Sequence, residues 1–195
     1  LSRVGNVTTE SMILAGIGLS AFFSACTMLL QYFADDIQVA ATVFWTFGDL
    51  GKAGWREVLL MTAALAPACI YFTRHGWSCN ALHWGDETAQ SLGVGVKGLR
   101  MTGMLLAGLV ISVATAFLGI IGFIGLLAPH CMRLFVGDDQ RFLFPASLLA
   151  GGLLLLCSDI LSRTLIAPVI IPVGIITSFA GAPLFLYLLV RRKRI

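Results

Sequence analysis

The chain has 195 residues, of which 58% are hydrophobic and only 12% are charged, and its mean hydropathy is +0.92. A soluble domain averages nearer a quarter charged residues, and a soluble fold of this size could not hide such an apolar excess, because roughly a third of its unfolded surface would stay wet. The net charge of +3 excludes little by itself. The composition therefore excludes an ordinary soluble domain and predicts a membrane protein.

The apolar residues gather in runs that predict membrane-spanning helices. A bilayer core is crossed by about 20 helical residues. The runs are continuously apolar rather than alternating, which favours helices over a β-barrel. We predict an all-α fold, a polytopic transmembrane helical bundle forming one domain over residues 1–195. The six predicted spans are residues 12–33, 58–73, 101–118, 123–136, 142–161 and 173–190.

The first run is rich in small residues, such as Gly16, Gly18 and Ser20. Small residues let helix backbones approach closely in lipid, so this face is either ordinary bundle packing or the smooth wall of a pathway. Residues 34–57 carry charges and aromatic side chains, which are typical of a membrane interface. We expect a short surface helix there, followed by glycine-marked turns.

The second run contains Pro67, which we expect to kink its helix. Residues 74–100 form the longest polar segment. In it, Asp86 and Glu87 suit the positive end of a helix dipole, and Gly93 suits the end of that helix. A second small helix is expected to run to Arg100. Two short polar helices predict a surface knob, and the alternative is a plain solvated loop.

The third run stops at three glycines, Gly119, Gly122 and Gly125. The fourth run has only 14 residues and contains Pro129, so it crosses only with help from tilt, bilayer thinning or neighbouring helices. Non-helical backbone at membrane depth survives only where it is buried or lines a wet cavity. Residues 137–141 predict a polar turn.

Near the end of the fifth run, Asp159 and Arg163 are four residues apart. This spacing predicts an i,i+4 helix pair, and the alternative is a buried pair or a ligand contact. Pro168 and Pro172 predict a bent, extended segment before the last run. We expect the last run to be interrupted by Gly181 and Pro183.

Basic residues are unevenly shared between the two sides of the predicted bundle. Because basic residues near the ends of spans stay cytoplasmic, the bias places both termini, residues 74–100 and residues 137–141 in the cytoplasm. The ten on that side are Arg3, Arg74, Lys97, Arg100, Arg133, Arg141, Arg191, Arg192, Lys193 and Arg194, and the three opposite are Lys52, Arg56 and Arg163.

The sequence shows no signature of a catalytic, cofactor or metal site. It has no phosphate-binding GxxxxGK[ST] loop and no HExxH or Cys/His metal spacing. The three histidines lie at predicted cytoplasmic ends, where solvated or capping roles are usual. The five cysteines form no CxxC pair and are interpreted as small packing residues. They are Cys26, Cys69, Cys79, Cys131 and Cys157.

Four stretches in order resemble the FecCD family of ABC transporter permeases. The central one is GFIGLLAPHCMRLFVGDDQRFLFPASLLAGGLLLLCSDILSRT, at residues 122–164. The others are APVIIPVGIITSFAGAPLFLYLLVRRK at 167–193, GDETAQSLG at 85–93 and LAGIGLSAFFSA at 14–25. Two departures are Asp86, where the family usually has Glu, and Ile170, where it often has Glu. The family has ten spans and this chain resembles the last six, so we expect a piece of a longer permease.

The resemblance assigns roles to named residues. It implies that a separate cytoplasmic ATPase docks on Gly85, Asp86, Glu87, Ala89, Leu92 and Gly93. It implies a cytoplasmic gate at Thr8 and Thr9. The remaining motif residues that it singles out are Gly122, Gly125, Pro129, His130, Arg133, Asp159, Arg163, Pro172, Gly174, Gly181 and Pro183.

The function that the resemblance implies is the membrane subunit of an importer in the inner cell membrane. Its substrate would be an iron-siderophore, haem or cobalamin. The implied partners are a second permease copy, ATP-binding subunits, an extracytoplasmic substrate-binding protein and the lipid bilayer, with no nucleic acid and no cofactor. The chain itself would not be an enzyme. The alternative is a secondary transporter or channel that works without an ATPase. An intramembrane enzyme would need a catalytic pair at depth, and none can be assembled from these spans.

Overall fold

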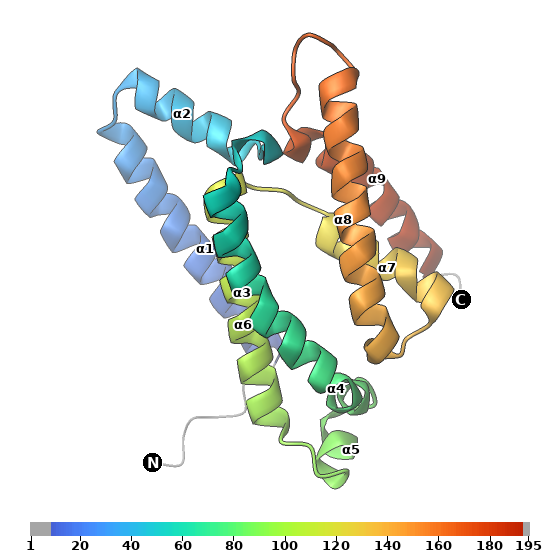
Figure 1. The fold of residues 1–195 in the computed structure, drawn as a ribbon. Coiled ribbons are helices and arrows are strands. Elements are labelled where there is room, and N and C mark those ends of the chain that lie inside the picture. Colours follow the sequence, from blue (N-terminus) through green and yellow to red (C-terminus); the bar gives the residue numbers. More distant parts are fainter. Residues whose placement is uncertain (1–8, 193–195) are drawn as a thin grey trace. The chain divides into compact units, whose positions relative to one another are not determined.

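A computed structural model describes residues 9–192 of the chain, and side chains from residue 13 to residue 186. Every regular element in this range is a helix, so the predicted all-α class is confirmed (Figure 1). The chain divides into two compact units, residues 1–44 and 45–195, and each is described separately.

The first unit contains helix α1 (Thr9–Tyr32) and most of helix α2 (Asp36–Thr46). Helix α1 coincides with the first predicted span. The start of α2 is fixed by Asp35, whose carbonyl oxygen accepts hydrogen bonds from Gln38 N at 2.9 Å and Val39 N at 3.0 Å. Asp36 lies in the first turn, where a carboxylate stabilises the helix dipole. The short helix predicted in residues 34–57 is therefore present.

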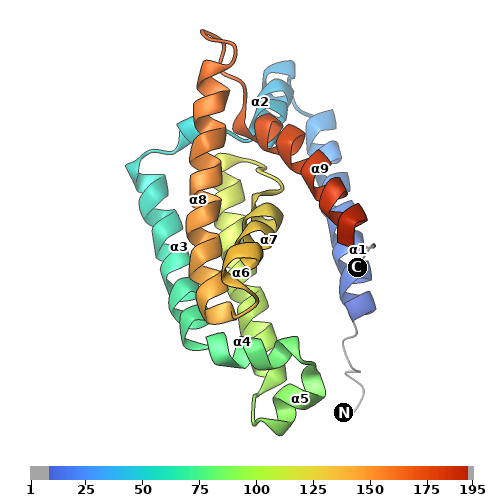
Figure 2. The same cartoon turned by 90° about the vertical axis from the view of Figure 1, so that its right-hand side faces the viewer.

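The second unit contains the remaining helices. Helix α3 packs along α6, α7 packs along α8, and α9 contacts both α7 and α8 (Figures 1 and 2). The elements are η1 (Leu50–Lys52), α3 (Trp55–Arg74), α4 (Gly76–His83), α5 (Asp86–Ser91), α6 (Val96–Leu118), α7 (Ile124–Val136), α8 (Gln140–Thr164) and α9 (Val173–Arg192).

A helix occupies each of the six predicted spans, but the helices differ in length. Among the described residues, four are long and apolar enough to cross a membrane, and two apolar helices are shorter. The four are Ile13–Tyr32, Trp55–Arg74, Val96–Leu118 and Gln140–Thr164, and the two are Ile124–Val136 and Val173–Leu186.

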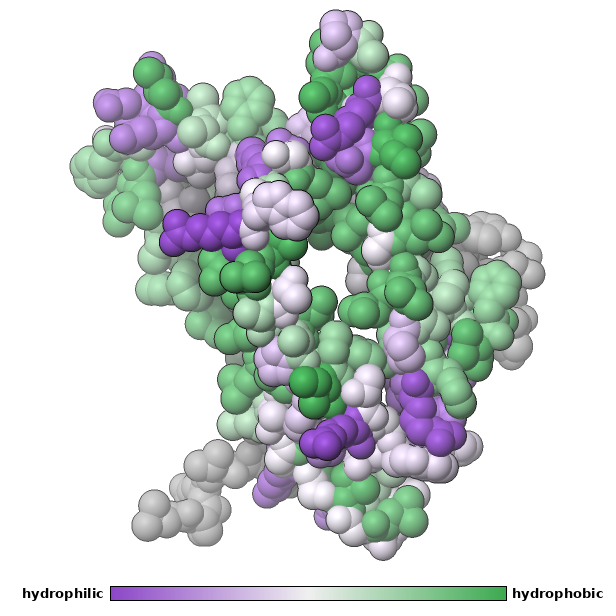
Figure 3. Space-filling view, in the orientation of Figure 1, coloured by the Kyte–Doolittle hydropathy of each residue, from purple (hydrophilic) through white to green (hydrophobic). Residues whose placement is uncertain are grey.

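The long helices expose apolar side chains that water would not tolerate at this density. On α6, Leu105 is 66% and Ile111 is 65% exposed, and on α8, Leu149 is 75% and Leu153 is 64% exposed. Figure 3 shows hydrophobic side chains over the bodies of the helices and hydrophilic ones gathered toward their ends. This distribution suits contact with lipid or with neighbouring membrane helices.

The predicted break after the third span is present, whereas the predicted interruption of the last span is wrong. Helix α6 ends at Leu118 because Gly119 has a φ of 78°, a left-handed conformation that glycine adopts without cost. Helix α9 instead continues through Gly181 and Pro183. A proline removes one hydrogen bond, and transmembrane helices accommodate that loss locally. Helix α3 likewise continues through Pro67.

Three segments of the second unit cross with their main chains in contact. The crossing lies at the end of the unit opposite α4 and α5. The crossing is formed by Gly48, Gly119 and Gly174, which we call the glycine node. Gly174 N donates to Gly48 O at 3.4 Å, and next to it Asp49 N donates to Leu118 O at 2.8 Å.

No side chain larger than hydrogen fits at the glycine node. A Cβ on Gly48 would lie 2.5 Å from Ile120 O, and a Cβ on Gly119 would overlap Trp45 O. A Cβ on Gly174 would lie 2.7 Å from Ile120 O and would overlap Phe47 O. The node therefore holds the end of α6 and the start of α9 against residues 45–49 through main-chain contacts.

Candidate functional site

The predicted knob is present between α3 and α6, and it consists of α4 and α5. The prediction of two short helices is correct in number but wrong in one position. The segment expected to form a small helix up to Arg100 is instead the first part of α6, because no residue after Gly95 stops the apolar helix before Leu118. The second short helix of the knob is α4, which comes before α5 in the chain.

Helix α5 begins and ends where the sequence predicts. Gly85 precedes it with a φ of 107° and Gly93 follows it with a φ of 80°, conformations that side chains other than hydrogen disfavour. Between these glycines, Ala89 is completely buried and donates its N–H to Gly85 O at 3.0 Å. Ala89 O accepts from Val94 N at 3.0 Å, which closes the turn after the helix.

The knob presents both charged and apolar side chains. Asp86 and Glu87 are exposed at the start of α5. Trp84 is 79% exposed and Leu92 is 68% exposed on either side of them. Exposed aromatic and apolar side chains beside charges are typical of a protein–protein contact surface.

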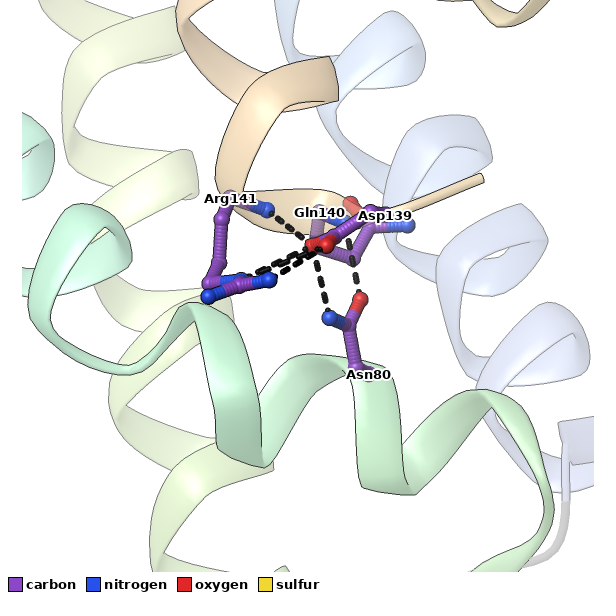
Figure 4. Close-up of polar contacts among 4 residues, drawn as sticks. All are labelled: Asn80, Asp139, Gln140 and Arg141. Atoms are coloured by element: carbon purple, nitrogen blue, oxygen red, sulfur yellow. Dashed lines mark hydrogen bonds and ion pairs between the residues drawn. The ribbon is translucent and has the colours of Figure 1, made fainter. Parts of the chain in front are cut away.

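A cluster of polar side chains attaches α4 to the start of α8. We call it the α4–α8 clamp, formed by Asn80, Asp139, Gln140 and Arg141 (Figure 4). Asn80 Nδ2 donates to Asp139 Oδ1 at 2.8 Å, and Asn80 Oδ1 accepts from Gln140 N at 2.7 Å. Both ends of one amide are therefore used to hold α8, and one of them satisfies a backbone N–H that the first turn of a helix leaves unpaired.

Asp139 and Arg141 complete the clamp. Asp139 is the N-cap of α8, and its Oδ1 accepts from Arg141 N at 3.0 Å. The two side chains form an ion pair at 2.8 Å. Arg141 also lies over the Trp77 ring, 3.9 Å from its centroid, in a cation–π contact. Gly76 is buried against Arg141, and a Cβ there would lie 2.8 Å from Arg141 Cγ.

Two pKa shifts accompany this arrangement. The hydrogen bond from Arg141, with that from Asn80, holds the pKa of Asp139 well below its usual range, so the carboxylate stays ionised. Burial raises the pKa of the Cys79 thiol, which keeps it protonated and unreactive. The second shift agrees with the interpretation of Cys79 as a packing residue.

The predicted turn at residues 137–141 lies directly against the knob, which the sequence did not reveal. Gly137 ends α7 with a φ of 81°, and α8 begins at Gln140, so the turn is two residues shorter than predicted at its end. Asp138 pairs back to Arg133 of α7 at 2.7 Å. The two adjacent aspartates thus attach the turn to α7 on one side and to α4 and α8 on the other.

A separate ion pair joins α5 to α6. Arg100 lies 2.9 Å from Asp86, with the two side chains 45% and 47% exposed. We call this pair the α5–α6 tie. An exposed pair of long side chains is worth little in stability, about 0–1 kcal/mol.

The other predicted site residues are dispersed. Gly122 lies in the break before α7, while Gly125, Pro129 and His130 lie within α7. A Cβ on Gly181 would overlap the Cβ of Phe123, which itself has a φ of 66°, so α9 packs closely on the break. Pro172 and Gly174 lie at the start of α9, with Gly174 in the glycine node, and Pro183 lies within α9.

Asp159 and Arg163 form the predicted i,i+4 pair, with Arg163 Nε 2.8 Å from Asp159 Oδ2. Their side chains are 21% and 46% exposed, so the pair is not buried. They lie at the end of α8 away from the clamp. Thr8 and the side chain of Thr9 fall outside the described residues, so the predicted gate stays a prediction.

Metal-binding clusters are not found in the part of the chain that the structure describes: no three His, Cys, Asp or Glu residues are placed to hold an ion. His75 caps the end of α3, with its Nδ1 3.0 Å from Tyr71 O, and its ring stacks on the Tyr71 ring. Asn80, Trp77 and Arg141 are contact residues that the sequence analysis missed as a group. The one available signal was Asp139, an aspartate just before a long apolar run.

Comparison with known proteins gives one consistent match. The model of the FecCD transport family matches residues 1–191. A Methanocaldococcus jannaschii protein named as an ABC transporter permease is 56% identical over 191 residues, which cover 98% of this chain and 55% of the relative. The hemin transport system permease protein HmuU of Yersinia pestis is 40% identical over 193 residues, covering 99% of this chain and 58% of HmuU.

Two further comparisons agree. The vitamin B12 import system permease protein BtuC of Vibrio vulnificus is 35% identical over 191 residues, covering 98% of this chain and 57% of BtuC. A solved structure described as a metal-chelate type ABC transporter in an inward-facing conformation superposes with a TM-score of 0.87 at 32% identity, over 94% of this chain and 61% of that one. The chain thus spans a little over half the length of the curated relatives it matches.

Proposed function

The chain belongs to the FecCD transport family, and on this premise we propose that it is part of the membrane-spanning permease subunit of an ABC importer. It forms part of a translocation pathway, and ATP is hydrolysed on a separate subunit. The observation that carries the proposal is the α4–α5 knob, whose exposed acids, tryptophan and leucine suit a protein-docking surface. The family match and the permease names of the relatives support it.

The proposed site for the ATPase is Gly85, Asp86, Glu87, Ala89, Leu92 and Gly93. Buried Ala89 and the two positive-φ glycines fix the backbone of α5, while Glu87 and Leu92 remain available for contact. A rigid turn that presents a few exposed side chains loses little entropy when a partner binds. We further propose that Thr8 and Thr9 belong to the cytoplasmic gate.

Residues 1–195 form a single transmembrane permease domain in this proposal, in the inner cell membrane, with both termini and the knob on the cytoplasmic side. The charge bias along the sequence supports this orientation. The proposed substrate class is a large metal chelate, namely an iron-siderophore, haem or a cobalamin. Relatives named for hemin and vitamin B12 transport support the class.

The proposed assembly contains a second permease copy, ATP-binding subunits on the knob and an extracytoplasmic substrate-binding protein. The four long apolar helices, with exposed leucines and isoleucines, leave ample surface for a second copy and for lipid. Two permease copies would present two knobs, one for each of two ATP-binding subunits.

The test is charge reversal on α5 in the full-length permease, co-expressed with the ATPase and the binding protein. Asp86→Lys with Glu87→Lys is expected to abolish uptake and to prevent co-purification of the ATPase. Because Asp86 also pairs with Arg100, Glu87→Lys alone isolates docking from the tie. The matched control is Asp35→Lys with Asp36→Lys, two adjacent acids at the start of another short helix, α2, which should leave co-purification unchanged. Normal uptake by the α5 variants, or ATP-independent substrate flux through the permease alone in liposomes, would refute the proposal.

A further inference from the structure

Apart from its chain connections to α3 and α6, the knob is attached to the rest of the second unit by two sets of polar side-chain contacts that differ in kind. One is the α4–α8 clamp, and the other is the α5–α6 tie. Figures 1 and 2 both place α4 beside the start of α8 and α5 beside the start of α6. A force applied to the knob can therefore reach the spans through either attachment, and their geometry decides which one carries it.

The clamp has the geometry of a rigid joint. Asn80 uses its amide donor on Asp139, the N-cap of α8, at 2.8 Å and its amide acceptor on Gln140, the first residue of α8, at 2.7 Å. Asp139 Oδ1 accepts from Asn80 Nδ2, Arg141 N and Arg141 Nε, at 2.8, 3.0 and 3.2 Å. All these side chains are half-buried, and networks of this kind are stiffer than their separate bonds.

The tie has the opposite character. It is one ion pair at 2.9 Å between side chains that are nearly half exposed. Long exposed side chains reorient at little cost, and salt screens their attraction. Displacement of α5 would stretch or break this pair, so the pair itself would transmit little of the movement to α6.

The turn to which the clamp is attached connects α8 to α7. Asp138, next to Asp139, pairs with Arg133 of α7 at 2.7 Å, but these side chains are 42% and 57% exposed, so it is the packing of α7 along α8 that makes the two helices move together. At the other end of α7, Phe123 adopts a positive φ and lies against Gly181 of α9. Bulky residues rarely adopt this conformation, and it persists only where surrounding contacts impose it.

We propose that the α4–α8 clamp transmits movement of the docked knob to the α7–α8 pair, and that Asn80 is the positioning residue of this link. The inference rests on the proposed function. The clamp stays closed while the knob moves, so α8 and α7 shift together with α4. The shift reaches α9 through Phe123 and Gly181, whereas the α5–α6 tie contributes little.

The experiment changes the side chains at positions 80 and 139 and then exchanges them. It uses the full-length permease, reconstituted with the ATPase and the binding protein. Asn80→Asp sets a second carboxylate against Asp139, and Asn80→Ala removes the contact without adding charge. Each is expected to lower substrate uptake per ATP hydrolysed by about tenfold, while ATPase co-purification is unchanged. The double variant Asn80→Asp with Asp139→Asn restores a donor–acceptor pair of the same shape and should recover most of the uptake.

Arg100→Gln is the matched control, because it breaks the tie and leaves the clamp intact. Its uptake should stay within about twofold of wild type. Hydrogen exchange of the α4 amides gives a second readout: exchange should speed up in Asn80→Asp and slow again in the exchanged pair. Recovery in that pair separates a direct link from general damage to the fold.

The outcomes separate the two proposals. If wild type shows no ATP-driven uptake, the proposed function fails, and the role of the clamp fails with it. If wild type transports and Asn80→Asp transports equally well per ATP, the clamp is not the link and the proposed function stands. If the exchanged pair is as impaired as Asn80→Asp, the contact between residues 80 and 139 is not what couples the knob to α8. Arg100→Gln matching the loss in Asn80→Asp would assign transmission to the tie instead.

Discussion

Different kinds of interaction join the helices at the two ends of the second unit. At the end that carries the knob, Asn80, Asp139 and Arg141 join helices through side-chain hydrogen bonds and an ion pair. At the other end, the glycine node joins chain segments through close main-chain contacts, beside which Trp45 Nε1 donates a hydrogen bond to Ala116 O at 3.3 Å. The first end can be altered by changing charge or hydrogen bonding, whereas the glycine node itself is altered by adding volume.

This difference follows from where polar groups are stabilised. Charged side chains keep their solvation near water, so helix ends at a membrane surface can be joined by long polar groups. Irregular backbone where chain segments cross in a membrane protein must satisfy its own polar groups, and close approach of glycine backbones allows that. The comparison predicts that variants of the glycine node are the more destabilising and that variants of the clamp are the more specific to transport.

The largest expected effect is at Gly174. A Cβ there overlaps Phe47 O and lies 2.7 Å from Ile120 O, and neither backbone atom can move without moving its whole segment. Gly174→Ala should destabilise the protein by about 1–3 kcal/mol, and Gly174→Val should prevent folding. The measurement is thermal stability in detergent, followed by size-exclusion chromatography.

The control for Gly174 is Gly108→Ala on α6, where a Cβ meets no atom within 4 Å. Removing a glycine from a helix interior should be neutral or stabilising by up to about 1 kcal/mol. Equal melting of the Gly174 and Gly108 alanine variants would show that the glycine node is not a close backbone crossing.

The next effect is at the contact between α9 and the break before α7. Gly181→Ala places a Cβ on the Cβ of Phe123, so we expect a loss of about 1–2 kcal/mol. Phe123→Gly removes that Cβ, and glycine adopts the positive φ without cost. The double variant should therefore lose less stability than the sum of the losses in the two single variants, and strictly additive losses would contradict the contact.

The clamp should show its effect in acid. Because the pKa of Asp139 is lowered in the folded state, the unfolded state takes up the proton first as pH falls. The stabilisation is then complete above the ordinary aspartate pKa of about 3.9 and is lost as pH falls below it toward the folded value. At neutral pH the melting temperature of wild type should be higher than that of Asp139→Asn, and this difference should shrink below about pH 4. A difference that is constant with pH would mean that the ionised carboxylate is not the stabilising group.

The smallest effect belongs to the α5–α6 tie. Arg100→Gln should lower stability by less than about 1 kcal/mol, because both side chains are nearly half exposed. The melting temperature of this variant should also be less sensitive to salt than that of wild type. A loss as large as that of the Gly181 variant would show that the tie bears much more of the attachment of the knob than its exposure indicates.

Several features of this protein follow from local sequence alone. Continuous apolar runs predict the long helices, and Gly119 predicts the end of α6, since both depend on residues close together in the chain. The same holds for α5, which lies between Gly85 and Gly93, and for the pair of Asp159 with Arg163. Helix α4 was missed because its eight residues carry neither a strong cap nor enough length for a periodic pattern.

Tertiary structure alone decided which of these pieces meet. Asn80 and Asp139 are 59 residues apart, and no local pattern marks an asparagine in a short helix as the partner of a distant aspartate. The glycines were recognisable as turns, but not as three segments crossing at one point. Hydrophobicity and backbone preference act between neighbours in the chain, whereas the clamp and the glycine node exist only once packing has brought separate helices together.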